Sequence, residues 1–522
     1  MLALTSLSWL SVIMLPFRSD HQQPRPGRRG AQGDTLGDLP RFTPVDADNP
    51  HDECGVFGVH LPHSLESDAA QVAFYGLYAL QHRGQESAGI AAADGRVIRN
   101  FTNVGLVSNA FRQEDLERLP GHIAVGHTRY STTGSSNGMN AQPIVAHGPT
   151  TELALAHNGN IVNAEEIRQR LLGWGVMTTT GTDSEVIALL LAWAPGQTWG
   201  ERSAYLMKSV KGAYSLVIAT KDTVIGIRDP HGVRPLCLGR FANGGWVIAS
   251  ESAALDHIGA QFVREVDPGE TVVIDRDGLV SVPNPLPHER VAHCVFEHIY
   301  FARPDSTLDG RLVHMSRSRM GAALANEHPV EADVVISIPE SANSAAVGYA
   351  KESGIPFELG LVKNRYVGRT FIEPDQRFRE LGVRNKFNPL PEVLAGKRVV
   401  VVDDSIVRGT TTPHIVQLLR RAGAIEIHVR VCAPPIKNPC HFGVDMASKD
   451  EFVASGRTVE QIREFIGADS LGYLSTERLH DAVGEDPTGA RFCDACFTGN
   501  YPIPIQLQMD KFALERTLHK GE

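Results

Sequence analysis

The sequence predicts two folds in succession: an α+β fold of layered sheets in the first half and an α/β fold with a parallel sheet in the second. From about Asp52 to residue 283, short β-type runs are separated by turn residues, with few helical segments between them. Beyond the proline-rich stretch 282–288, short apolar runs alternate with helical stretches. Closely spaced short strands indicate layered sheets, and strand–helix alternation is typical of parallel sheets with crossover helices.

The individual elements follow from the same periodicities. In the first half we expect strands at 55–60, 123–126, 153–156, 214–219 and 271–275, and helices at 69–81, 164–172 and 183–192. In the second half we expect strands at 334–338, 399–402 and 427–432, and helices at 314–327, 344–353 and 414–422. Residues 282–288 are expected to link the two halves.

Length and composition narrow the class of protein. The 522 residues suffice for two or three domains, and 42% apolar residues is ordinary globular usage. A net charge of −10 argues against a nonspecific binder of nucleic acid or of a membrane surface. Seven cysteines are too few for a disulfide scaffold, so we expect a reducing compartment and a cytoplasmic location.

The N-terminal stretch lacks the features of a signal peptide. Residues 2–17 are largely apolar, but no Lys or Arg precedes them and no small-x-small cleavage site follows. Residues 18–50 are rich in Pro, Gly and Arg, which predicts disorder. We therefore expect the ordered chain to begin near Asp52.

The strongest single motif is the string VVVVDDSIVRGTTT at residues 399–412. Its β-branched run predicts a buried strand, and Asp403 and Asp404 end that strand where open α/β sheets bind ligands. A glycine-containing loop follows, and we expect Thr412 to cap the next helix, which Gly423 ends. Backbone N–H groups and hydroxyls at 408–412 would cradle a phosphate.

This string resembles the phosphoribosyl pyrophosphate (PRPP) loop of the type I phosphoribosyltransferases. The resemblance implies that Asp403 and Asp404 bind the ribose hydroxyls and Mg²⁺. The 5-phosphate would then lie against the following loop, whose implied ligands are Ser405, Arg408, Gly409, Thr410 and Thr411. The segment VISIPESANS at 335–344 resembles the pyrophosphate-side turn of the glutamine-dependent members, which implies that Ser341 lies near the Mg²⁺.

The basic segment 360–390 is the third element of this predicted site. Seven Lys or Arg residues stand there among only three acids, without clear periodicity. A charged surface loop explains most of them. The functional interpretation is a lid that closes on the pyrophosphate and excludes water, with Lys363 and Arg369 as ligands.

A second candidate site begins at Cys54, in the string DECGVFG where order is expected to start. A free thiol has a pKa of about 8.5 and needs a nearby base to act as a nucleophile. If the chain cut itself before Cys54, the new α-amine, with a pKa of about 7.7–8, could be that base, whereas an amide nitrogen could not. The mechanism therefore requires removal of residues 1–53.

Four further motifs accompany Cys54: QHRGQESAG at 81–89, HTRYSTTG at 127–134, HNGN at 157–160 and GTDSE at 181–185. Together they resemble the N-terminal-nucleophile (Ntn) glutamine amidotransferases, which implies a four-layer αββα domain. Cys54 would attack the glutamine amide, and Asn158 with the Gly159 N–H would form the oxyanion hole. Arg129 would bind the substrate α-carboxylate and Asp183 its α-ammonium. The resemblance gives His127 and His157 structural roles.

The remaining cysteines form two groups. Cys237 and Cys432 lie in apolar β-type runs and are expected to be core thiols. The other four are Cys294, Cys440 and the C-x₂-C pair Cys493 and Cys496. Spacing alone leaves three alternatives open: a structural Zn²⁺, an iron–sulfur cluster, and a redox-active pair.

The contexts of these four cysteines resemble cluster-ligand segments in one branch of the amidophosphoribosyltransferases. That branch carries one structural [4Fe–4S] cluster per subunit and a propeptide before the nucleophile. The resemblance spans about residues 52–505. It implies a propeptide at 1–53, a glutaminase domain at 54–285, a phosphoribosyltransferase domain at 286–500 and a tail at 501–522.

The implied activity is synthesis of 5-phosphoribosylamine from glutamine and PRPP with one Mg²⁺ per subunit, the first committed step of purine (IMP) biosynthesis. The family also implies feedback inhibition by purine nucleotides and a homotetramer. Two alternatives remain open. A hexosamine-phosphate synthase would have no use for residues 399–412. A non-enzymatic nucleotide sensor would require damage at Cys54, Asn158 or Asp403, and the sequence shows none.

Overall fold

The computed structural model of the chain describes residues 54–62, 69–130, 138–284, 286, 290–364, 386–446, 449–484 and 490–505. The predicted propeptide, Arg369 with most of the predicted lid, and residues 506–522 of the predicted tail lie outside this described part. None of the described helices combines the length and apolar character needed to cross a membrane.

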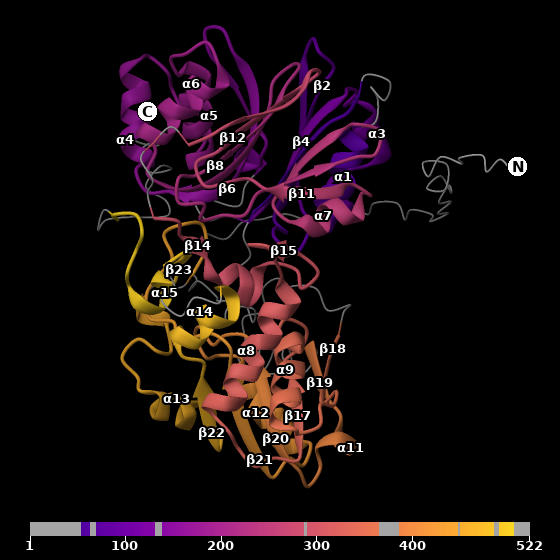
Figure 1. Cartoon of the computed structure of the whole chain (residues 1–522), viewed down its shortest axis with the longest axis vertical. Helices are drawn as coiled ribbons and strands as arrows, with labels where there is room; N and C mark the ends of the chain where they lie inside the picture. The colour runs from indigo at the N-terminus through magenta and orange to yellow at the C-terminus, as the bar shows by residue number, and fades with distance from the viewer. Residues whose placement is uncertain are drawn as a thin grey trace, which may run out of the picture. The chain divides into compact units, whose positions relative to one another are not determined.

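Two antiparallel sheets form the centre of the first half (Figure 1). The first has the strand order β11-β9-β10-β1-β4-β2-β3, and the second has the order β13-β12-β8-β7-β6-β5. Strands of the first sheet are β1 (Gly55–His60), β2 (Ser87–Ala93), β3 (Ile98–Val104), β4 (Ile123–Arg129), β9 (Cys237–Arg240), β10 (Trp246–Ala249) and β11 (Gln261–Glu265). Those of the second are β5 (Ile144–His147), β6 (Glu152–Ile161), β7 (Gly212–Ala219), β8 (Val224–Arg228), β12 (Thr271–Asp275) and β13 (Gly278–Val282).

The two sheets pack face to face between layers of helices. Val56 and Val125 of the first sheet share a buried cluster with Ala156 and Val217 of the second. The other face of the first sheet packs on α1 (Ala69–Ala79) and α7 (Ser252–His257), and that of the second on α4 (Ala164–Gly173), α5 (Asp183–Trp193) and α6 (Trp199–Ser209). This is the four-layer αββα arrangement that the sequence predicted.

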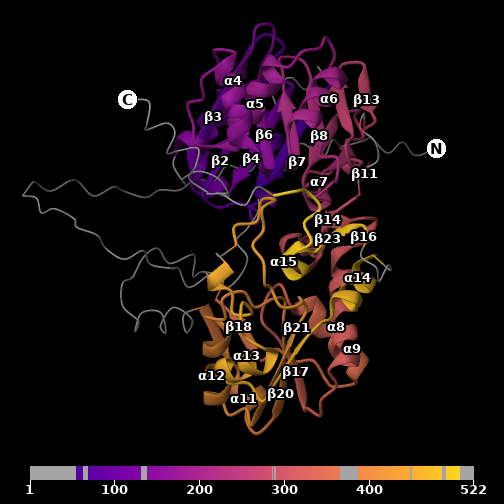
Figure 2. The ribbon, with the colours of Figure 1, turned by 90° about the vertical axis from the view of Figure 1, so that its left-hand side faces the viewer.

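The second half contains a parallel sheet with the order β17-β20-β21-β22. Its strands are β17 (Val334–Ser337), β20 (Arg398–Asp403), β21 (Glu426–Val431) and β22 (Ser470–Tyr473). Helices α8 (Val313–Glu327) and α9 (Asn343–Ser353) cover one face, and α12 (Thr412–Arg421) and α13 (Val459–Ile466) cover the other (Figure 2). Val400 and Val402 pack with the first pair of helices, and Val399 and Val401 with the second pair, as a strand period of two requires.

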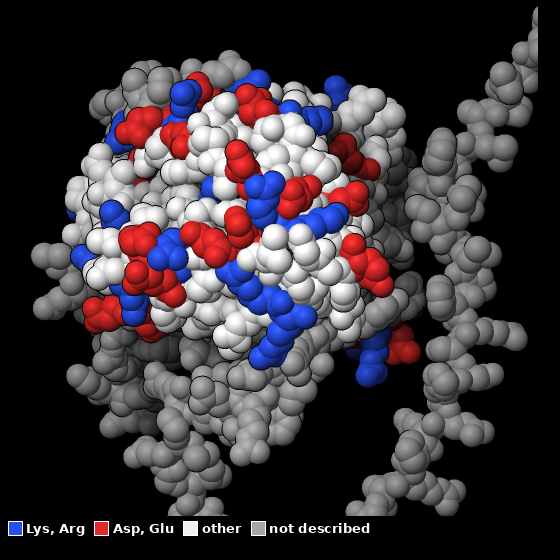
Figure 3. All heavy atoms as spheres, turned by 90° about the horizontal axis from the view of Figure 1, so that it is seen from below, with Lys and Arg blue, Asp and Glu red and all other residues white. Residues whose placement is uncertain are grey.

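Shorter elements complete the described part of the chain. They are α2 (Val107–Ala110), α3 (Gln113–Glu117), η3 (Gly138–Asn140), β14 (His293–Cys294), η4 (Glu297–Phe301), β15 (Thr307–Leu308), β16 (Arg311–Leu312), β18 (Leu361–Lys363), β19 (Phe387–Pro389), α11 (Pro391–Leu394), η5 (Lys449–Glu451), α14 (Thr476–Gly484), β23 (Phe492–Cys493) and α15 (Ala495–Thr498). On the face seen from below, basic and acidic side chains are interspersed among the residues drawn in colour (Figure 3).

Two local predictions need correction. Thr412 does not cap α12: the helix already begins at Thr412, and its N-cap residue, Thr411, has helical dihedral angles and makes no capping hydrogen bond with its side chain. The predicted strand 153–156 is longer, because β6 runs on through Asn158 to Ile161. Pairing with β7 along its length holds these residues extended, although Asn and Gly have low strand propensity.

Candidate active sites

Cys54 lies directly before β1, at the inner end of a small pocket. Strand β1 pairs with β4 so that Gly55 faces Thr128, and this places Cys54 beside the end of β4. The Cys54 thiol is buried and donates a hydrogen bond to the Tyr130 carbonyl at 3.3 Å. The pocket measures about 240 Å³, and its lining residues are Cys54, Arg129, Tyr130, Gln142, His157, Gly159, Thr182, Asp183 and Ser184.

Burial makes the Cys54 thiol a weak acid in the chain as encoded. Desolvation is the main cause that raises the pKa of Cys54 to about 11, while the Tyr130 carbonyl contact and the Arg129 charge lower it in part. The thiol is therefore protonated at neutral pH. A group that accepts its proton is needed before the sulfur can attack a substrate.

Of the two predicted oxyanion-hole residues on β6, in the other sheet, Gly159 lines the same pocket and the neighbouring Asn158 does not. They pair with Ser215 and Tyr214 of β7. The Asn158 side chain is fully buried, and neither of its polar atoms has a hydrogen-bond partner among the described residues. Buried amides are almost always paired in folded proteins, so this one is available to a ligand. An oxyanion formed at Cys54 is a suitable partner for its N–H group.

Arg129 and Asp183 place opposite charges in the pocket. Both side chains are buried, and both line the cavity. Asp183 opens α5, and one of its oxygens accepts the Ile161 N–H at 3.1 Å. Glu185 accepts backbone and hydroxyl hydrogen bonds from Thr179 and Thr180, which fixes the approach to α5. The two charges can bind the α-carboxylate and α-ammonium groups of an amino acid.

The two predicted structural histidines belong to a buried network beneath this pocket. His127 Nε2–H donates to the His157 carbonyl at 3.0 Å. Burial lowers the pKa of His127 to about 3 and also lowers that of His157, so both rings are neutral. Gln142 accepts the His157 N–H at 2.8 Å and donates to Ser184 at 3.0 Å. Neither Gln142 nor Ser184 was predicted as a site residue: Ser184 lies in the GTDSE motif but was assigned no role, and no motif contains Gln142.

The second site is a pocket of about 730 Å³ at the carboxyl ends of β17 and β20. Its lining residues are Tyr300, Ile338, Pro339, Glu340, Ser341, Lys363, Lys386, Phe387, Asp403, Asp404, Ser405, Thr411, Thr412 and Ile415. The structure thus brings together six of the predicted PRPP or Mg²⁺ ligands: Ser341, Lys363, Asp403, Asp404, Ser405 and Thr411. They come from three separate segments of the chain: the turn after β17, strand β18, and the end of β20 with the loop that follows it.

Two hydroxyl groups hold the Asp404 carboxylate in this pocket. Its side chain accepts hydrogen bonds from the hydroxyls of Ser341 and Ser405, the latter at 2.7 Å. Burial raises the pKa of Asp404, and these hydrogen bonds and the charge of Arg317 oppose that rise. With Asp403 and the Ser341 hydroxyl, Asp404 offers the oxygen donors that Mg²⁺ prefers. The residues present therefore fit a hard cation.

The remaining predicted phosphate ligands do not line the described cavity. Arg408 forms an ion pair with Glu451 at 2.7 Å, and Gly409 has a left-handed φ of +70°. Thr410 lies in the same loop between β20 and α12. Tyr300, Glu340 and Lys386 line the cavity although they were not predicted as ligands. Lys386 lies in the basic segment 360–390, which was predicted to bind pyrophosphate. No local sequence feature predicted that Tyr300 would line the cavity.

Comparison with known proteins decides the family. A model of the glutamine amidotransferase domain matches residues 127–257. The amidophosphoribosyltransferase of Mycobacterium tuberculosis is 49% identical over 489 residues, which are 91% of each chain. A structure of glutamine PRPP amidotransferase from B. subtilis, complexed with ADP and GMP, is 45% identical with a TM-score of 0.82, and the match covers 88% of this chain and 99% of that one.

The chain belongs to the amidophosphoribosyltransferase family. The predicted fold class and enzyme class are thereby confirmed. A solved structure of an allosteric regulatory enzyme of purine biosynthesis is also 44% identical, with a TM-score of 0.83 over 88% of this chain and 99% of that one.

Apart from Cys54 and the two core thiols, four cysteines lie in segments that contact one another in the second half of the chain. Cys294 on β14 and Cys493 on β23 are direct partners in a parallel bridge. The Cys496 carbonyl accepts the N–H groups of Lys437 and Asn438, just before Cys440. Burial raises the pKa values of Cys294, Cys493 and Cys496, and all three are raised further by Cys440. Within the described ranges, no group of three or more His, Cys, Asp or Glu side chains is spaced to hold a single metal ion.

The predicted core thiols are confirmed as such. Cys237 is 3% exposed and Cys432 is 2% exposed, and both pack in hydrophobic clusters. Burial raises the pKa values of both thiols, so neither is expected to react at neutral pH.

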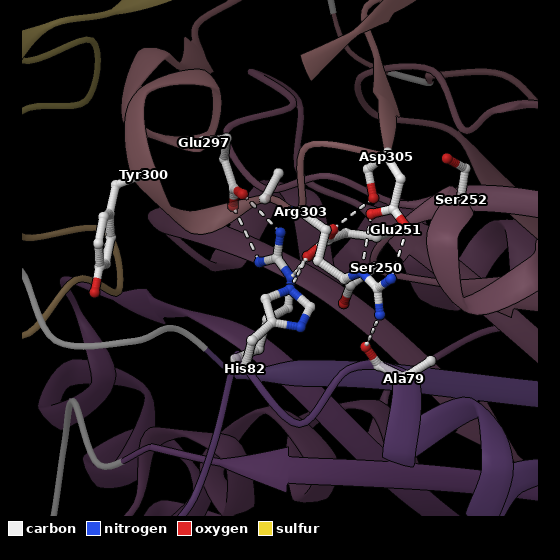
Figure 4. A network of polar contacts seen from close by, with 12 residues as sticks. Ala79, His82, Ser250, Glu251, Ser252, Glu297, Tyr300, Arg303 and Asp305 are labelled. Carbon is white, nitrogen blue, oxygen red and sulfur yellow. Dashed lines mark hydrogen bonds and ion pairs between the residues drawn. The ribbon is translucent and has the colours of Figure 1, made fainter. Parts of the chain in front are cut away.

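A buried ion-pair network joins the two halves of the family fold (Figure 4). Arg83, fully buried after α1, pairs with Glu251 and, at 2.6 Å, with Glu297 of η4. Glu251 also accepts the Ser306 hydroxyl at 2.6 Å and the Arg303 N–H at 2.9 Å. Arg83 belongs to the QHRGQESAG motif, so this motif is tied directly to the segment that carries Tyr300 into the pocket at the carboxyl ends of β17 and β20.

The pH dependence of glutamine hydrolysis should reveal the pKa of the base that accepts the Cys54 proton. Because burial keeps the thiol protonated, attack requires a neutral acceptor, and the α-amine of a chain beginning at Cys54 is neutral only above its pKa of about 8. In the processed enzyme, kcat/KM for glutamine should therefore rise with pH and level off above about pH 8. Initial-rate glutaminase assays from pH 6 to pH 10 measure this. A profile that still rises at pH 10 would mean that the thiol itself titrates.

Proposed function

We propose that this chain converts glutamine, PRPP and water into 5-phosphoribosylamine, glutamate and pyrophosphate, the first committed step of purine biosynthesis. The observation that carries the proposal is the pairing of two sites in one chain: buried Cys54 beside Arg129 and Asp183, and an acidic pocket around Asp404 at the edge of a parallel sheet. Neither a hexosamine-phosphate synthase nor a non-enzymatic nucleotide sensor requires both sites.

The glutaminase step requires an earlier self-cleavage, in which water hydrolyses the Glu53–Cys54 peptide bond, releases residues 1–53 and leaves Cys54 with a free α-amine. The Cys54 sulfur then attacks the amide carbon of glutamine, and its proton passes to that amine. Asn158 and the Gly159 N–H stabilise the oxyanion, each donor contributing about 3–4 kcal/mol. Collapse breaks the C–N bond and releases ammonia, with the proton returned to the leaving nitrogen. Water then hydrolyses the thioester to glutamate.

The transferase step uses the acidic pocket. Asp403 and Asp404 bind the ribose hydroxyls. Ser341 with the two acids would hold Mg²⁺, which would supply positive charge to offset that of the pyrophosphate. The loop from Ser405 through Arg408, Gly409, Thr410 and Thr411 binds the 5-phosphate. The ammonia nitrogen attacks C1 of the ribose, the C1–O bond to pyrophosphate breaks, and a proton leaves the new ammonium. Lys363 and Arg369, in the predicted lid segment 360–390, bind the pyrophosphate.

We assign the chain to the branch of the family that has a propeptide and a [4Fe–4S] cluster. Cys294, Cys440, Cys493 and Cys496 would hold the cluster. The support is that the backbones of Cys294 and Cys493 pair in the β14–β23 bridge, that the Cys496 carbonyl binds the segment before Cys440, and that Cys440 raises the pKa values of the other three thiols. One thiolate per iron is the usual ligation of such a cluster. It would join the linker, the transferase body and the C-terminal segment.

Replacing a cluster ligand should release the metal. Protein purified without air should contain about four iron and four sulfide per chain. Cys440→Ser should lose most of both, whereas Cys432→Ser, which changes a buried thiol outside the set, should lose neither. Metal analysis and the visible absorption spectrum measure this. Stoichiometric zinc in place of iron would overturn the assignment.

Three further properties are part of the proposal. The domains divide at residues 54–285, 286–500 and 501–522 after loss of the propeptide. Purine nucleotides act as feedback inhibitors, since the B. subtilis relative was solved with ADP and GMP. The assembly is a homotetramer in the cytoplasm, where a reducing environment would keep the chain's free cysteines as thiols.

Isotope transfer tests the reaction itself. Enzyme supplied with PRPP, Mg²⁺ and glutamine labelled with ¹⁵N at the amide should place the label in phosphoribosylamine and release one pyrophosphate per glutamate. Excess unlabelled ammonia should dilute the label only weakly if ammonia passes inside the protein. Glutamate formation without any PRPP-dependent pyrophosphate would refute the proposal.

A further inference from the structure

Two glycine backbones meet where the transferase half touches the glutaminase half. A Cβ atom at Gly443 would lie 2.8 Å from the Cα of Gly159, 2.9 Å from its carbonyl carbon and 3.2 Å from its carbonyl oxygen. Gly443 also has a left-handed φ of +111°, which disfavours any residue with a side chain. Only glycine lets these two peptides lie in direct contact.

Gly159 is enclosed from the other side as well. A Cβ atom at Gly159 would lie 2.1 Å from the Ala213 carbonyl oxygen of β7. Its φ of +142° is within the range that favours glycine. The Gly159 peptide is therefore held between β7 and Gly443, with no space to relax.

The segment that carries Gly443 is itself firmly anchored. Arg234 donates through Nε and Nη2 to the Phe442 carbonyl at 2.9 and 2.7 Å. Asn160, which follows Gly159, donates to the His441 carbonyl at 3.0 Å. Arg234 is fully buried and lies 3.7 Å from Glu297, the acid that Arg83 also pairs with. Three buried charges thus support the loop that presses on Gly159.

We propose that Gly443 is a positioning residue for glutamine hydrolysis, which rests on the function proposed above for Gly159. By packing on the Cα and the carbonyl group of Gly159, it fixes the residue whose N–H stabilises the oxyanion formed on Cys54. Such donors act because they are already in place when charge develops, and a displacement of about 1 Å can cost about 10²-fold in rate. The glutaminase half is therefore completed by a backbone contact from the transferase half.

The test compares Gly443→Ala with Gly278→Ala. Gly278, in the β12–β13 hairpin, has a similar φ of +119°, but a Cβ atom there would meet no other atom within 4 Å, so it controls for backbone strain alone. Gly443→Ala should lower glutamine-dependent kcat by about 10²-fold and leave KM for glutamine and ammonia-dependent synthesis within about twofold. An aldehyde analogue of glutamine, which forms a tetrahedral adduct on Cys54, should bind about 10²-fold more weakly, with glutamate affinity unchanged.

Two results would overturn the inference. In the first, Gly443→Ala has the same activities as Gly278→Ala. In the second, Gly443→Ala loses the glutamine-dependent and the ammonia-dependent activity to the same extent. If Gly443→Ala does not fold, Arg234→Lys serves instead, since it keeps the charge beside Glu297 but loses the paired donation to Phe442. It should show a smaller defect confined to glutamine use, and unchanged glutamine use would overturn the inference. Failure of the proposed function is distinguishable, because the unmodified enzyme would then release no glutamine-dependent pyrophosphate.

Discussion

Replacing Cys54 by alanine should abolish glutamine-dependent synthesis of phosphoribosylamine and leave ammonia-dependent synthesis within about twofold. Loss of a catalytic nucleophile typically costs about 10⁴-fold or more in kcat. The transferase pocket should be unaffected, because Cys54 does not line it. The variant should also retain residues 1–53, since the self-cleavage needs the same thiol. Pyrophosphate release with glutamine and with ammonium chloride, in parallel assays, measures both activities.

Cys237→Ala is the matched control for this prediction. Cys237 is a second buried thiol of the same sheet with a raised pKa, but it lies in the hydrophobic cluster under α1 and α7. Its replacement should lower the free energy of unfolding by about 1 kcal/mol and spare both activities. If Cys54→Ala removed the ammonia-dependent activity as well, Cys54 would be mainly structural.

Replacing Asp404 by asparagine should impair the transferase reaction and spare the glutaminase reaction. Synthesis of phosphoribosylamine from glutamine and from ammonia should fall together, by about 10²–10³-fold, because the pocket loses a carboxylate needed for the ribose hydroxyls and for Mg²⁺. Hydrolysis of glutamine to glutamate at Cys54 should continue. Asparagine has nearly the same shape and is neutral, so the buried position should tolerate it.

Asp333→Asn is the control for Asp404→Asn. Asp333 directly precedes β17 and pairs with Arg398, the first residue of β20. Both residues therefore lie at the amino ends of these strands, whereas the pocket lies at their carboxyl ends. Its replacement should change both activities by less than about twofold, since pairs of exposed charges contribute little. Parallel assays with increasing Mg²⁺ separate weaker cation binding from slower chemistry. Full ammonia-dependent activity of Asp404→Asn would remove Asp404 from the site.

The sequence predicted those parts of the structure that depend on local pattern. Strands β1 and β12 have the predicted bounds, since each is a short β-type run that the flanking residues interrupt. Asp403 and Asp404 could be placed at the ligand edge because the carboxyl end of a buried parallel strand always lies there. The extension of β6 was missed because its pairing with β7, more than fifty residues away along the chain, overrides local propensity.

The parts of the sites that could not be predicted are those built by contacts between distant segments. Tyr300 enters the PRPP pocket from a π-helical turn that precedes the transferase domain core, and no motif marks it. The role of Glu297 could not be predicted for the same reason, since it depends on the buried partners Arg83 and Arg234 from the other half. Gly443 lies 284 positions from Gly159, and only the fold brings the two together.

The intact mass of the active enzyme, purified without air, tests the central claim most directly. We propose that Cys54 acts only when its own α-amine is free, because burial of the thiol makes a separate base necessary. Protein that hydrolyses glutamine should have the mass of a chain beginning at Cys54, with residues 1–53 absent. Full glutaminase activity in a chain that still carries Met1 would contradict the account.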